Sequence, residues 1–100
     1  MINLIYSDLI KRYEKILTST SRGFDTNHEF LESWVPSTNI NQSISDLINA
    51  AFDYNIKKME IIFSKEENSS LEFDKLKKKF LNSHTMELAD NKLVVLVKEE

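Results

Sequence analysis

The chain contains no cysteine, one glycine, one proline and two histidines among its 100 residues. Without cysteine it has no disulfide framework, no thiolate zinc site and no cysteine nucleophile. One glycine cannot build the phosphate loops G-x-x-x-x-G-K or G-x-G-x-x-G, nor the G-x-S-x-G turn of a serine hydrolase. Two histidines supply few general bases. We therefore predict that the protein is not an enzyme and holds no cofactor.

Long apolar runs are also missing. The first fifteen residues, MINLIYSDLIKRYEK, carry charge from Asp8 onward and match neither a signal peptide nor a membrane span. We therefore expect a cytoplasmic protein that does not bind a membrane. Its 41% of hydrophobic residues is typical of a folded chain. A length of 100 residues predicts a single domain over residues 1–100.

Positive charge is absent from the middle of the chain. The net charge of −3 opposes direct nucleic-acid binding, because basic surface dominates that affinity. From Gly23 to Ile56 there is no Lys or Arg, while five acidic residues stand there beside several aromatic ones. Interfaces favour aromatic anchors within a polar rim, and complementary charge speeds capture of a partner. This run therefore predicts a surface that binds a basic protein.

We assign seven residues of the base-free run to this predicted surface: Phe24, Asp25, Glu29, Glu32, Trp34, Asp46 and Asp53. The alternative interpretation is structural. In that case Phe30 and Trp34 fill the core, and the acidic side chains only keep the protein in solution.

One histidine stands at a spacing that metal ligands use. His28 and Glu32 lie four residues apart and would share one face of a helix. However, HEFLE has a glutamate where H-E-x-x-H has its second histidine, and only His84 or a distant carboxylate is left as a third ligand. We predict no metal site here and interpret the segment as a solvated helix start, where acidic residues favour the N-terminal dipole.

The only basic run is KLKKK, Lys75 to Lys79. Glu72 and Asp74 stand close to it in the sequence, so we interpret the run as a solvated helix face. The alternative is a small patch that contacts phosphate, which the net charge disfavours.

The front of the chain has the periodicity of helices. Apolar residues spaced by three and four positions predict a helix over residues 3–20. A short helix over residues 28–34 follows, between the single glycine and the single proline. A third helix is expected over residues 41–54, capped by Asn39 or Asn41.

The back of the chain mixes strands with a helix. Residues 58–64, KMEIIFS, alternate apolar and polar side chains and predict a strand with one covered face. Residues 65–70, KEENSS, are expected to form a loop. Ser69 and Glu72 then resemble a capping box, which predicts a helix to about residue 81.

The final segment, HTMELADNKLVVLVK, predicts a hairpin that turns near Asp90-Asn91. Residues 93–97 are all apolar, which indicates a central strand covered on both faces. The expected fold is α+β, with three N-terminal helices followed by β-α-β-β and a three-stranded, mainly antiparallel sheet of order 1-3-2. The helix between the first two strands would cover one face of the sheet, and the N-terminal helices the other.

In its size, its acidic charge and the segment FDTNHEFLESW, the chain resembles bacterial immunity proteins of contact-dependent inhibition and bacteriocin systems. The resemblance is one of general character over the whole chain, and the segment matches no family motif. It implies that acidic side chains occupy the phosphate-binding groove of a basic toxin domain, often a nuclease, and that Trp34 or Phe24 anchors the contact.

Two other classes of binding protein fit the same observations. A phage- or plasmid-encoded inhibitor or antitoxin would use identical physics against a host enzyme or a paired toxin. A small regulatory subunit would instead add an outer strand to a partner's sheet, and residues 84–88 are the more apolar candidate for that strand.

Overall fold

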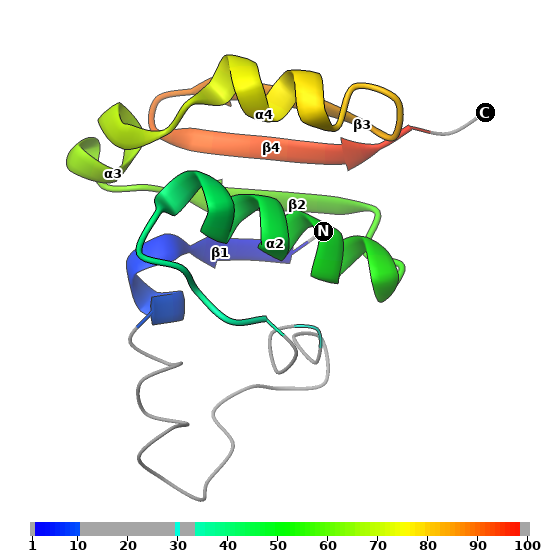
Figure 1. The fold of residues 1–100 in the computed structure, drawn as a ribbon, viewed down its shortest axis with the longest axis horizontal. Helices are drawn as coiled ribbons and strands as arrows, with labels where there is room; N and C mark the ends of the chain where they lie inside the picture. The colour runs from blue at the N-terminus through cyan, green and yellow to red at the C-terminus, as the bar shows by residue number, and fades with distance from the viewer. Residues whose placement is uncertain (1, 11–29, 31–33, 99–100) are drawn as a thin grey trace, which may run out of the picture.

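The computed structural model describes residues 2–10, 30 and 34–98, and it shows an α+β fold (Figure 1). A four-stranded mixed sheet has the order β1-β2-β4-β3. Its strands are β1 (Ile2–Ile5), β2 (Lys58–Ile62), β3 (His84–Ala89) and β4 (Lys92–Val97). The helices are α2 (Ile40–Asp53), α3 (Lys65–Ser70) and α4 (Phe73–Lys79), and residues 6–10 are also helical.

The prediction of three N-terminal helices and a three-stranded sheet of order 1-3-2 is wrong. The chain begins with strand β1, which runs parallel to β2 and places Leu4 opposite Ile61. Leu4 is buried whereas Asn3 and Ile5 are exposed, so the true period here is two residues. Four residues are too few for this alternation to outweigh a helical spacing that continues to Leu9. Only the pairing with β2, far along the chain, decides between the two.

All buried side chains of the strands belong to one face of the sheet. Leu4 lies opposite Ile61, which lies opposite Leu93, and all three are almost fully buried. The buried side chains of α2 and α4 complete the same core, and both helices lie on the same side of the sheet (Figure 1). In the part of the chain that the structure describes, the expectation that helices cover both faces is therefore wrong.

The placement of the described helices on one face follows from the strand order. Because β1 is a strand, α2 belongs to a crossover between the parallel strands β1 and β2. A second crossover, through α3 and α4, joins β2 to β3, which are parallel to each other across β4. Both connections step in the same direction across the sheet, and right-handed connections that step the same way place their helices on the same face.

The C-terminal hairpin forms at the predicted turn. Asp90 and Asn91 have φ angles of 53° and 62°, the left-handed pair that a two-residue hairpin turn of type I′ requires. β4 lies between β2 and β3 and runs antiparallel to both. It is covered on one face only, since Leu96 on the other face remains 38% exposed. The prediction of a strand buried on both faces is therefore wrong.

The segment predicted as a loop is helix α3. Ser64 caps this helix by accepting from the Glu67 backbone N–H at 3.1 Å, and the Glu67 carboxylate accepts from the Ser64 N–H at 2.7 Å. The capping box predicted for Ser69 and Glu72 is wrong, because α4 begins after Glu72 without any side-chain cap. Two successive S-x-x-E patterns compete here, and the first one forms the cap.

Candidate functional site

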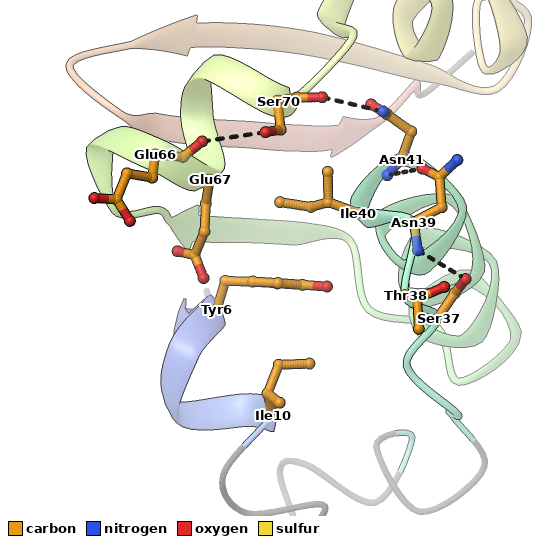
Figure 2. Close-up of a pocket in the computed structure, with 10 residues that line it drawn as sticks. All are labelled: Tyr6, Ile10, Ser37, Thr38, Asn39, Ile40, Asn41, Glu66, Glu67 and Ser70. Carbon is orange, nitrogen blue, oxygen red and sulfur yellow. Dashed lines mark hydrogen bonds between the residues drawn. The ribbon is translucent and has the colours of Figure 1, made fainter.

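A groove opens between the helical residues 6–10, the segment that leads into α2, and helix α3 (Figure 2). Its volume is about 580 Å³. We call it the acidic groove, and its described lining residues are Tyr6, Ile10, Ser37, Thr38, Asn39, Ile40, Asn41, Glu66, Glu67 and Ser70. Two carboxylates and no Lys or Arg are among these described residues.

One wall of the groove, segment 34–39, is held against α2 by hydrogen bonds. Trp34 is only 3% exposed, and its indole Nε1 donates to the Ser43 carbonyl oxygen at 2.9 Å. The backbone N–H of Ser37 donates to the Ser43 hydroxyl at 3.3 Å. Asn39 then starts the helix as its N-cap, because its Oδ1 accepts from the Asn41 N–H at 2.9 Å. Segment 34–39 is thereby held in a defined path against the first turn of α2.

The opposite wall is α3, which Asn41 joins to α2. The Asn41 amide Nδ2 donates to the Ser70 carbonyl at 3.2 Å, and its Oδ1 accepts from the Glu72 N–H at 2.5 Å. This side chain therefore satisfies two backbone groups where α3 ends and α4 begins. The capping box at Ser64 orders the other end of α3, which carries Glu66 and Glu67 in its first turn.

The acidic groove combines negative charge with apolar surface. The Glu67 carboxylate points toward the Tyr6 ring, whereas that of Glu66 points away from it (Figure 2). Burial raises the pKa of Tyr6, a hydrogen bond with Ser43 lowers this pKa, and the charge of Glu67 raises it. Ile10 and Ile40 supply apolar surface nearby. A Lys or Arg side chain fits this environment, because its aliphatic stem packs on apolar groups while its head pairs with a carboxylate.

The structure describes three of the seven residues that the sequence assigned to a binding surface. Phe24, Asp25, Glu29 and Glu32 lie outside the described residues. Trp34 belongs to the hydrophobic core, as does Phe30. Asp46 accepts from the Gln42 Nε2 at 2.8 Å, and Asp53 is exposed at the last residue of α2; neither lines the groove. The base-free run contributes its residues 37–41 instead.

Sequence reasoning missed Glu66 and Glu67. Both follow Lys65, outside the base-free run, in a segment that was predicted to be a loop. The S-x-x-E pattern of Ser64 and Glu67 was the available signal, since a capping box predicts an ordered helix start with its acidic side chains in fixed places.

His84 is a buried residue that packs against aromatic rings. It is 5% exposed and lies edge-on between the rings of Phe52 and Phe80, with centroid distances of 5.2 and 5.4 Å. Its Nδ1 is 2.7 Å from the Ser83 hydroxyl oxygen, and burial lowers the pKa of its imidazole. Within residues 2–10, 30 and 34–98, no group of three or more His, Asp or Glu residues is placed to hold a metal ion. His28 and Glu32 are not among these residues.

No protein-family model matches the chain, and no curated protein or solved structure was found to be similar to it. In the described part of the chain, every helix is too short or too polar to cross a membrane.

Proposed function

We propose that this protein is a binding protein that inhibits a basic protein partner, as immunity proteins inhibit toxins. The acidic groove is the proposed contact site. The observation that carries the proposal concerns the described lining residues, in which the Glu67 carboxylate points toward the Tyr6 ring beside apolar surface and no base is present. Glu66 adds a second negative charge to the lining, although its carboxylate points away from this ring. The sequence adds support, because residues 37–41 of the base-free run form one wall of this groove. Further acidic residues come before and after these positions in the sequence.

The chemistry of the groove supports capture of a Lys or Arg side chain. Hydrogen bonds to charged groups contribute about 1.5–3 kcal/mol each. Complementary charge also accelerates association, which matters for an inhibitor that must reach its target before damage occurs. A partner whose basic residues bind phosphate or nucleic acid would have these residues occupied, and its activity would be blocked.

The first experiment measures binding to the product of the adjacent gene after co-expression and co-purification. In the double variant Glu66→Lys with Glu67→Gln, we expect affinity to fall at least tenfold, about 1.4 kcal/mol. Glutamine keeps the capping box while removing its charge. Glu87→Lys is the matched control, because Glu87 is an exposed strand residue outside the groove lining and its reversal should change affinity less than threefold.

A second set of reversals tests the residues predicted from the sequence alone. Asp25, Glu29 and Glu32 are changed together to lysine in the same assay. If both sets leave binding and protection undiminished, the proposed function is wrong. If only the second set weakens binding, the inhibitory role stands and the contact lies outside the groove.

The edge of the sheet favours a second candidate function, a regulatory subunit that adds a strand to a partner. Among the described strands, β3 pairs only with β4. The two-residue turn makes Ala89 and Lys92 a hydrogen-bonded pair, so alternation leaves the backbone groups of Met86 and Leu88 facing outward. The salt dependence of partner binding distinguishes the two candidate functions. Added salt weakens binding through charged side chains much more than binding through strand addition.

A further inference from the structure

A second, smaller cleft lies between α2 and α4 and has a different charge. Its volume is about 180 Å³. We call it the lysine cleft, and its lining residues are Asn39, Asn41, Gln42, Ser45, Glu72, Lys75, Leu76 and Lys79. It therefore contains two residues of the basic run KLKKK, brought against the first turns of α2.

Ser45 is the unusual member of this cleft. It is only 2% exposed, and its hydroxyl oxygen has no hydrogen-bond partner among the described residues. A serine inside a helix commonly bonds to the carbonyl four residues earlier, which would satisfy it. A buried polar group without a partner is destabilising and therefore calls for an explanation, such as a ligand. Ser45 lines the cleft beside Lys75 and Lys79.

The charged residues that line the cleft have a positive net charge. Lys75 and Lys79 lie four residues apart on α4, so they occupy the same helix face. Glu72 forms an ion pair with Lys75, with 2.5 Å between Oε2 and Nζ, which leaves Lys79 as the uncompensated charge of the lining. The N-terminal end of α2 adds the positive end of a helix dipole.

We propose that the lysine cleft binds a small oxyanion such as a phosphate group, held by Lys79 and Lys75 and by a hydrogen bond donated from the Ser45 hydroxyl. The phosphate group is either free or carried on a larger molecule. This site is separate from the acidic groove and needs no protein partner. It also gives the basic run a role beyond a solvated helix face.

The test titrates the protein with inorganic phosphate while chloride keeps the ionic strength constant, and follows backbone amide shifts by NMR. We expect saturable shifts confined to residues 41–45 and 72–79. Lys79→Gln should weaken phosphate binding about tenfold, the loss of one charge-assisted hydrogen bond. Lys78→Gln is the matched control, with the same charge change on the same helix but outside the cleft lining, and should alter affinity less than about twofold.

Ser45→Ala separates ligand binding from a structural role. Removal of an unpartnered hydroxyl should raise the melting temperature of the free protein, while the further rise caused by phosphate should shrink. O-phosphoserine forms a parallel titration: tighter binding than inorganic phosphate would identify a carried group, and weaker binding a free ion.

Three results would overturn the site: no saturable response to either probe, equal effects of the Lys78 and Lys79 variants, or a destabilised Ser45→Ala variant with unchanged phosphate affinity. Because none of these measurements involves the basic partner, their failure is distinct from failure of the acidic groove.

Discussion

The acidic groove and the lysine cleft border the same end of helix α2 but differ in charge. Both are lined by Asn39 and Asn41, but the groove opens toward α3 and the cleft toward α4. The groove measures about 580 Å³ and the cleft about 180 Å³. Glu66 and Glu67 give the groove its negative charge, whereas the lysines of α4 outnumber the single glutamate of the cleft.

Helix dipoles explain part of both charge clusters without any ligand. Glu66 and Glu67 stand in the first turn of α3, and Lys79 stands in the last turn of α4, where such charges are favoured. The difference lies in the buried groups, because the Ser45 hydroxyl in the cleft has no hydrogen-bond partner among the described residues. No described residue of the groove lining shares that property. The groove therefore has the character of an exposed contact surface, whereas the cleft contains a buried polar group whose lack of a partner is destabilising.

The largest predicted effect comes from Trp34, the core residue that holds segment 34–39 against α2. Trp34→Ala removes a buried ring and its hydrogen bond to Ser43, so we expect the free energy of unfolding to fall by about 3–5 kcal/mol. Urea denaturation measures this change. Trp34→Phe should recover part of the loss, since it keeps a buried aromatic ring but not the hydrogen bond to Ser43. A Trp34→Ala variant of wild-type stability with weakened partner binding would instead make Trp34 a contact residue, as the sequence first suggested.

A smaller effect is expected from Asn41, the side chain that lies between the two regions. Asn41→Ala removes hydrogen bonds to Ser70 and Glu72, both in exposed surroundings where water replaces them in part. We expect a loss of about 1–2 kcal/mol, together with weaker binding in both the groove and the cleft. Thermal unfolding and the two binding assays check this result. Asn41→Asp keeps the acceptor for Glu72 and should lose less; a variant that weakens only one site would show that the two regions are independent.

The sequence predicted elements whose signals are local. Asn39 was expected as a cap and is the N-cap of α2, and Asp90-Asn91 was expected as a turn and forms one. β1 was missed because its identity depends on pairing with β2 rather than on its own four residues. The same error also led to the wrong prediction of which face of the sheet the helices cover. With β1 as the first strand, α2 is part of a crossover between two strands rather than a separate helix.

The candidate site was less predictable than the fold. The base-free run contributes residues 37–41 to the lining of the groove. However, Trp34, one of the two aromatic residues proposed as its anchor, is buried in the core. Charge along the sequence cannot show that Glu66 and Glu67 lie across a groove from residues 37–41, because that proximity arises from tertiary packing. Nor can it show that the Ser45 hydroxyl lacks a hydrogen-bond partner within residues 2–10, 30 and 34–98.

The smallest predicted effect comes from a substitution that should alter only the acidic groove. Ser64→Ala removes the cap from the Glu67 N–H, and loss of such a cap costs about 1 kcal/mol. Because α3 has only six residues, its first turn should fray and release the Glu67 carboxylate from its position near Tyr6. We expect weaker partner binding with unchanged phosphate binding, measured by the two titrations on the same sample. Ser64→Asp, which retains a capping oxygen, should restore partner binding; equal weakening of both ligands in Ser64→Ala would show that α3 also supports the lysine cleft.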